Sequence, residues 1–252
     1  MYLYYNLKNL FSLSFLQAKN NFKGGENGSR LNVGWYLLDS LAFFVVLLYL
    51  FEYVLGVQSK VYPIYLLIGL AVFNFFRFST VNAFVILGRN KGKINYVFTP
   101  EVFILSVLLQ ALFLHFFEFI FIGLVLLFYG MSLAGLFFYP IILFFLSLFV
   151  FGFSLILAVI GFFQLKLLKG WNVFVRTLWF VTPTFYFIES GSYIYTFNLF
   201  NPTFYFLHLT REIIIDLNIP SFLFSLVAIF FGLIFFLIGI IVYNKFRSRI
   251  IK

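Results

Sequence analysis

Four charged side chains and one histidine interrupt the long apolar runs of this sequence: Asp39, Glu52, Arg77, His115 and Glu118. An ionisable side chain inside an apolar segment is costly, so each is a functional candidate by default. Asp39 and Glu52 lie near opposite ends of one run, where both can reach interfacial water, and Arg77 can snorkel or pair with Asp39. His115 lies one helical turn before Glu118, which favours a polar contact. Structural pairing, a substrate path and a proton relay all stay open as roles.

The sequence lacks the motifs with which a chain binds and hydrolyses nucleotides. Residues 88–93, GRNKGK, resemble a phosphate-binding loop, but one residue too few separates the glycines and Ile94 replaces the Mg²⁺-binding hydroxyl. No H-E-x-x-H or G-x-S-x-G motif occurs. Cys is absent, which excludes disulfides and thiolate metal sites. We interpret 88–93 as a basic loop and expect this chain to bind no metal and no cofactor.

The surroundings of these residues are typical of a membrane protein. Apolar types make up 63% of the 252 residues and charged types 10%, against about 25% charged in soluble domains. A soluble chain would expose apolar patches large enough to cause aggregation, whereas lipid solvates them. The runs reach about 20 residues, the length that crosses a hydrocarbon core of ~30 Å. We predict an all-α membrane protein forming a single transmembrane domain over 1–252.

Six apolar runs within 33–243 predict six membrane-spanning helices. The expected ranges are 33–55, 61–87, 102–129, 133–163, 177–188 and 221–243, with a basic loop over 164–176 and a basic cytoplasmic tail over 244–252. Residues 1–24 alternate apolar and polar types at helical spacing, which predicts an amphipathic helix in the membrane interface. The Gly-rich stretch 24–29 then predicts a flexible turn.

Residues 189–220 fit neither a span nor a solvated loop. The stretch is rich in apolar residues but is broken by Gly191, Asn198, Pro202 and Pro220. Non-helical backbone at membrane depth is tolerated only inside protein or beside a wet cavity. We therefore predict a re-entrant segment of short helices on the outer side, between spans five and six.

The basic residues indicate the orientation of the chain. Of the 17 Lys and Arg, all but Lys60, Arg77 and Arg211 fall on one side of the predicted spans. Such residues concentrate in cytoplasmic loops, so we expect both termini in the cytoplasm of a multi-pass protein of the cytoplasmic (inner) membrane. The same bias accounts for the net charge of +9 without a nucleic-acid partner.

Several stretches together resemble the permease subunit of ABC exporters for cell-surface polysaccharides, of the O-antigen and teichoic-acid type. The stretches that carry the resemblance are Gly34-Trp35 after the amphipathic segment, 74–76 (NFF), 98–101 (FTPE) after the basic loop, 179–186 (WFVTPTFY), and 201–205 (NPTFY) with Arg211 further on. Each stretch is short, but their order and spacing cover nearly the whole chain.

The resemblance implies a homodimeric channel driven by two copies of a separate ATPase subunit, which would hold the ATP and Mg²⁺. It implies membrane lipid around the channel and a lipid-linked glycan inside it. The ATPase would dock on the amino-terminal helix and on Arg89, Asn90, Lys91, Lys93, Phe98 and Glu101. Residues expected on the substrate path are Trp35, Tyr36, Arg77, Trp179 and Tyr186. An outer gate would include Tyr195, Asn201, Pro202 and Arg211.

The predicted function is therefore export of an O-antigen-like or teichoic-acid-like polysaccharide by a transport subunit that is not itself an enzyme. One alternative keeps the permease and changes the cargo to a drug or a lipid. Another is a membrane-embedded enzyme acting on a lipid substrate, which should cluster acids, His or metal ligands at one membrane face. The eight Asp and Glu are scattered instead, which favours transport.

Overall fold

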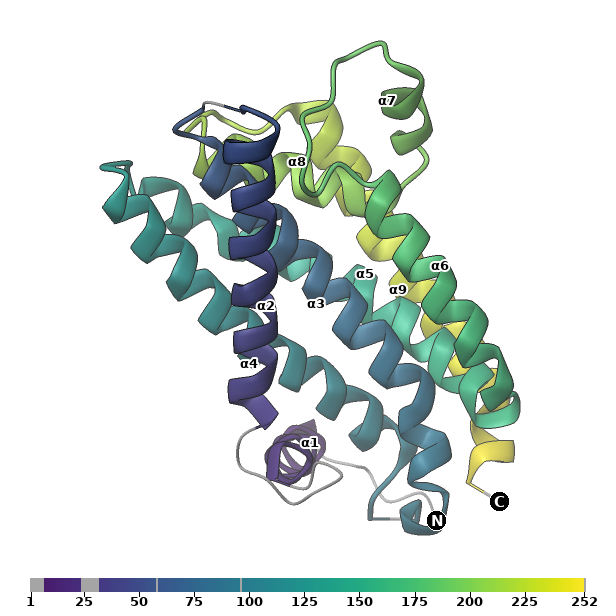
Figure 1. The fold of residues 1–252 in the computed structure, drawn as a ribbon. Helices are drawn as coiled ribbons and strands as arrows, with labels where there is room; N and C mark the ends of the chain where they lie inside the picture. Colours follow the sequence, from purple (N-terminus) through teal and green to yellow (C-terminus); the bar gives the residue numbers. More distant parts are fainter. Residues whose placement is uncertain (1–6, 24–31, 58, 96, 252) are drawn as a thin grey trace.

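A computed structural model describes residues 7–23, 32–57, 59–95 and 97–251, and all regular structure within these ranges is helical (Figure 1). The all-α prediction is thus confirmed for this part of the chain. The predicted turn at 24–29 lies outside it. The helices are α1 (Leu7–Lys23), α2 (Asn32–Tyr49), η1 (Leu50–Val54), α3 (Tyr62–Arg89), η2 (Lys91–Lys93), α4 (Pro100–Phe128), α5 (Ala134–Phe163), η3 (Leu165–Leu167), α6 (Leu168–Val181), α7 (Tyr193–Asn198), α8 (Pro202–Ile214) and α9 (Phe222–Ile250).

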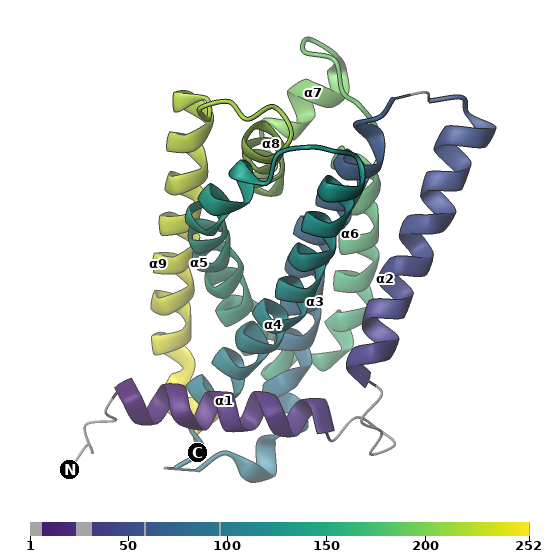
Figure 2. The ribbon, with the colours of Figure 1, turned by 90° about the vertical axis from the view of Figure 1, so that its left-hand side faces the viewer.

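Four of the described helices are long and apolar enough to cross a membrane: α3, α4, α5 and α9. Each has 28 to 30 residues, or roughly 42–45 Å at 1.5 Å per residue, which exceeds a hydrocarbon core of ~30 Å. Figures 1 and 2 show them running together between the base and the top of the molecule. They match four of the six predicted spans.

The first predicted span is formed by α2 and the π-helix η1 in succession, which together cover Asn32–Val54. Figure 2 shows α2 standing at one side of the bundle. Its inner face buries Phe44 and Leu47, while Val45 and Val46 are exposed on the opposite face. This division is typical of a helix with protein on one side and an apolar solvent on the other.

The helix in the region of the fifth predicted span, α6, differs from the predicted range at both ends. The chain is already helical at Leu168, inside the loop expected over 164–176, and α6 stops at Val181. The polar residues Lys169, Asn172 and Arg176 follow spacings of three and four, so they mark one face of an amphipathic helix and not a loop. Pro183 disfavours helical backbone at Thr182, which has extended φ and ψ angles and ends the helix.

The predicted tail over 244–252 is also largely helical, because α9 continues to Ile250.

Close packing of α9 on α5 depends on glycines. A Cβ atom at Gly239 would lie 2.4 Å from the carbonyl oxygen of Gly152, and a Cβ at Gly152 would lie 2.2 Å from that of Phe235. Small residues let membrane helices approach in this way.

The amino-terminal helix α1 runs across the base of the bundle, roughly perpendicular to the long helices (Figure 2). Ser14 and Ala18 are buried on its inner side, and Gln110 of α4 donates a hydrogen bond to the carbonyl oxygen of Ala18 at 3.2 Å. Phe11 and Phe15 are exposed. The predicted helix is present, and its placement in a membrane interface stays a prediction.

Two short helices, α7 and α8, form the opposite end of the molecule within the stretch 189–220 (Figures 1 and 2). Helix α8 is buried on almost every side, from Thr203 to Ile214. Short helices were predicted here, and a re-entrant position in a membrane stays a prediction.

Candidate functional site: a polar groove between α2, α3 and α6

A cavity of about 410 Å³ lies between α2, α3 and α6, and half of its lining residues are polar. The residues recur at helical spacing, so each helix presents one face to the cavity. On α3 they follow each other at intervals of four, three and four. The lining consists of Asp39, Ser40 and Phe43 of α2, Leu70, Asn74, Arg77 and Val81 of α3, and Asn172, Val175, Arg176, Trp179 and Phe180 of α6.

Two arginines face this groove from different helices at comparable heights. Arg77 precedes the end of α3 at Arg89 by twelve residues, and Arg176 follows the start of α6 at Leu168 by eight. These separations correspond to about 18 Å and about 12 Å along the helix axes. Both side chains are exposed, and within the described part of the chain neither forms an ion pair. Asp39 also lines the groove, but the pair with Arg77, one of the two alternatives that the sequence left open for Arg77, does not form.

A hydrogen-bonded network lies behind the groove and joins four helices. Asn74 donates to the hydroxyl of Ser40 at 3.1 Å and to a carboxylate oxygen of Glu118 at 3.4 Å. His115 contacts Glu118 at 3.3 Å through Nδ1, and its Nε2 contacts the hydroxyl of Tyr139. The expected contact between His115 and Glu118 is therefore confirmed. Because these groups satisfy each other, they stabilise the packing of α2, α3, α4 and α5.

The five residues predicted on the substrate path do not all lie in the groove. Arg77 and Trp179 line the groove, and the Trp179 ring lies 5.4 Å from Phe43 and 4.7 Å from Phe185. Tyr36 packs on Phe78 at 5.4 Å, beside the groove but not in its lining. Tyr186 lies beyond α6, where its hydroxyl donates to the carbonyl of Val181. The side chain of Trp35 lies outside the described residues.

The predicted docking residues gather at the base, where α3 ends and α4 begins. Arg89 and Lys93 are exposed, and the Lys91 ammonium lies 4.5 Å from the ring centroid of Phe162. Asn90 instead turns inward, because its side chain donates to the carbonyl of Ile86. Phe98 is half-buried, with its ring 6.3 Å from that of Phe103. Glu101 forms an ion pair with Arg247 near the end of α9.

The predicted gate residues hold α8 against the end of α6. Asn201 donates to Thr182 at 2.8 Å and accepts from the backbone N–H of Thr203, which fixes the first turn of α8. Pro202 occupies the first helical position, where its missing N–H costs nothing. The Tyr195 ring lies 5.8 Å from Phe204. Arg211 is buried and donates to the carbonyls of Pro183, Tyr65 and Thr184.

Sequence reasoning missed Arg176, Asn172, Asn74 and Ser40 as residues of the groove. The basic loop predicted over 164–176 includes Arg176, because basic residues are common in such loops. The spacing of Lys169, Asn172 and Arg176 contains the signal that places Arg176 on a helix face. Asn74 and Ser40 gave no comparable signal, because one polar residue in an apolar run does not show which neighbour it faces.

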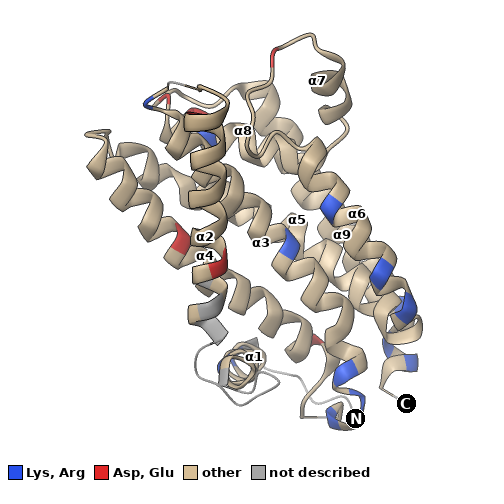
Figure 3. Ribbon diagram, in the orientation of Figure 1, with Lys and Arg blue, Asp and Glu red and all other residues tan. Residues whose placement is uncertain are grey.

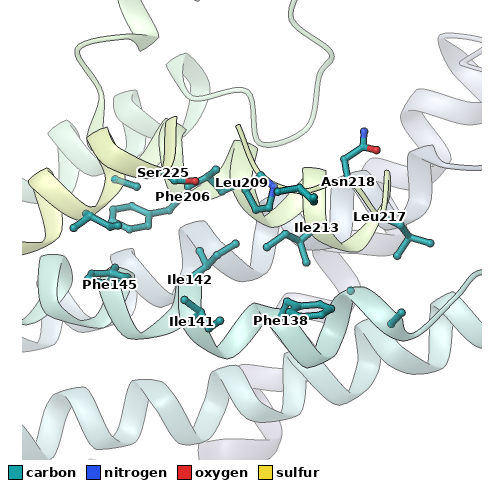
Figure 4. A pocket seen from close by; sticks show the side chains of 16 residues that line it. Phe138, Ile141, Ile142, Phe145, Phe206, Leu209, Ile213, Leu217, Asn218 and Ser225 are labelled. Atoms are coloured by element: carbon teal, nitrogen blue, oxygen red, sulfur yellow. The ribbon is translucent and has the colours of Figure 1, made fainter. Parts of the chain in front are cut away.

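A second cavity, of about 390 Å³, lies between α5, α8 and α9. Figure 4 shows Phe138 and Ile142 of α5 opposite Leu209 and Ile213 of α8. None of its lining residues is charged, and Asn218 and Ser225 supply its polar side chains, so it lacks a charged group that could bind an ion. Among the residues that the structure describes, no group of three or more His, Asp or Glu side chains is placed to hold a metal ion. The polar groove is therefore the candidate site.

The apolar helices of the fold and the polar groove between them define a multi-pass helical membrane protein. No protein-family model matches the sequence. Two curated sequences from Klebsiella pneumoniae, both described as the O-antigen export system permease protein RfbA, are each 27% identical to it over 254 residues. The alignments cover 97% of this chain and 96% of each relative. The chain is thus a homologue of these permease proteins along nearly its whole length.

Proposed function

We propose that this protein is the permease subunit of an ABC exporter that moves an O-antigen-like, lipid-linked polysaccharide across the cytoplasmic membrane. The observation that carries the proposal is the end-to-end alignment with O-antigen export permeases, which leaves no large part of either chain unmatched. The absence of a nucleotide-binding motif from the sequence fits a transport subunit. ATP and Mg²⁺ would then bind to a partner ATPase.

Six membrane crossings would bring both termini to the cytoplasmic side. The two crossings beyond α3, α4, α5 and α9 are α2 with η1, and α6 with the segment that follows it. Figure 3 shows basic residues along α6 and at the base of the bundle, the end at which α1 lies. That distribution supports a cytoplasmic base. Helices α7 and α8 would form the outer re-entrant segment and the gate.

A homodimer would cover the exposed groove and keep it away from lipid. Lipid cannot solvate two arginines at the depth of Arg77 and Arg176, so a bundle with this face in the membrane needs protein or water against it. A second copy, with its own groove turned towards this one, would enclose a wet path lined by α2, α3 and α6 of both copies. Trp179 would then offer an aromatic surface to sugars, together with Tyr36 beside the groove and Tyr186 beyond it. Trp35 stays a proposed residue of the path.

The base of the bundle supplies the surface for two ATPase subunits. Arg89 and Lys93 are exposed there, and the adjoining Glu101 is tied to α9 through Arg247. A movement of this loop on ATP binding would therefore be transmitted to two long helices. Lys91 and Phe98 complete the surface, while Asn90 supports it from inside.

Complementation tests the proposal. The gene is expressed, together with its cognate ATPase gene, in a Klebsiella strain that lacks its own O-antigen permease, and surface polysaccharide is measured by gel and antibody. Restored surface polysaccharide and co-purification of the ATPase subunit are expected. Surface polysaccharide that stays absent although the permease and ATPase assemble in the membrane would reject this cargo, and failure to co-purify any ATPase would reject the exporter.

A further inference from the structure

Arg77 and Arg176 lie in one cavity without a carboxylate partner within 4 Å among the described residues. A guanidinium group carries five donors in a planar fork that matches two oxygens of a phosphate. Arginine at membrane depth is retained when it meets an anion or lines a polar path. Two such forks on different helices are therefore suited to hold a group with several phosphate oxygens between them.

The other lining residues agree with an anionic ligand that carries an apolar chain. Asp39 is the single acid in the lining, so the two arginines leave the groove with a net positive charge. Asn172 adds an amide beside Arg176. Phe43 and Phe180 also line the groove and are 44% and 58% exposed. They offer an exposed apolar surface in the same groove as the arginines.

From this arrangement we propose that the groove binds the phosphate or diphosphate group of a lipid carrier, clamped between Arg77 and Arg176. The inference rests on the proposed function and deepens it. It places the anion between α3 and α6, about 12–18 Å from the base along the helix axes, and not at the basic loop 88–93. The carrier's chain lies along Phe43 and Phe180, and Trp179 faces the first sugar.

The test uses the purified full-length protein in nanodiscs of phosphatidylcholine, with undecaprenyl diphosphate as the probe and binding measured at equilibrium. We expect Arg77→Gln and Arg176→Gln each to weaken binding about tenfold or more, because each variant loses charge-assisted hydrogen bonds to the phosphate oxygens. Asp39→Asn should tighten binding. Arg249→Gln is the matched control, because Arg249 lies outside the groove, near the end of α9, and should bind as the wild type does.

Competitors distinguish the possible sources of the anion. Undecaprenol, which has the chain without phosphate, should compete poorly. Competition by inorganic pyrophosphate or by phosphatidylglycerol as strong as that by undecaprenyl diphosphate itself would overturn the lipid-carrier assignment. Arg77→Lys and Arg176→Lys keep the charge and should retain part of the binding, which guards against misfolded glutamine variants.

Equal binding by the wild type and by both glutamine variants would reject the inference. That result is separable from failure of the proposed function, because surface polysaccharide in the complemented strain is measured independently. If export is restored and the arginine variants export normally, the permease assignment stands and the arginine clamp is wrong.

Discussion

The guanidinium of Arg211 lies 3.3 Å from the ring centroid of Tyr65 and also donates a hydrogen bond to the Tyr65 carbonyl at 3.1 Å. The same group donates to Pro183 at 2.7 Å and to Thr184 at 2.9 Å. One buried side chain thus joins α8 to α3 and to the non-helical segment after α6. The carbonyls of Pro183 and Thr184 follow the end of α6 at Val181, so Arg211 supplies hydrogen bonds to groups outside any helix.

Replacing Arg211 should therefore destabilise the outer end of the molecule. In Arg211→Gln the planar donors over Tyr65 are lost, and two or more hydrogen bonds to a charged group amount to about 3 kcal/mol or more. Arg211→Lys should be intermediate, because an ammonium is a point donor and cannot stack in the same way. Unfolding of the purified protein in detergent measures the loss. Arg249→Lys is the surface control, and a wild-type midpoint for Arg211→Gln would refute the role.

Gly69 lies beneath this contact and leaves no room for a side chain. A Cβ atom there would lie 1.9 Å from the Thr184 carbonyl oxygen and 2.8 Å from a nitrogen of Arg211. Gly69→Ala should cost about 1–3 kcal/mol through overpacking. Gly170→Ala is matched to it, because Gly170 is also helical but has nothing within 4 Å of its Cβ position. That control should gain up to about 1 kcal/mol of helix stability. Similar unfolding curves for the two variants would contradict the packing.

The sequence predicts the fold better than it predicts the site. Hydropathy defines α3, α4, α5 and α9 because a membrane span is a long local pattern. The start of helix α6 is not predicted, because its polar residues resemble those of a basic loop. The spacings of three and four between Lys169, Asn172 and Arg176 are the signal that they share one helix face. The groove depends on which faces of α2, α3 and α6 meet. Which faces meet depends on the tertiary structure and is not visible in the local sequence. Arg77 stands out because it is a charge in an apolar run, whereas the sequence does not show that Asn74 and Arg176 face the same groove.

The orientation of the chain can be tested directly because the protein contains no Cys. Thr196→Cys places one thiol on the exposed part of α7, and Lys91→Cys places one at the opposite end, after α3. A membrane-impermeant maleimide applied to intact cells should label position 196 and leave position 91 unlabelled until the cells are opened. The reverse pattern would overturn the proposed cytoplasmic base and, with it, the docking surface.

The ion pair between Glu101 and Arg247 connects the start of α4 to the end of α9. If the ATPase docks on the adjoining loop, this pair transmits its movement, so its loss should separate ATP hydrolysis from transport. We expect Glu101→Gln and Arg247→Gln to keep the ATPase bound and hydrolysing ATP while surface polysaccharide falls several-fold. The exchanged double variant, Glu101→Arg with Arg247→Glu, restores opposite charges at the same two places and should recover part of the export.

Export by both single variants at the wild-type rate would show that the pair only stabilises the base. Loss of ATPase binding in Arg247→Gln would instead make Arg247 part of the docking surface. The pair is partly exposed, with side chains 38% and 26% accessible for Arg247 and Glu101, so its static contribution to stability should be about 1 kcal/mol or less. Unfolding of the single variants should therefore change little, which separates a defect in coupling from a defect in folding.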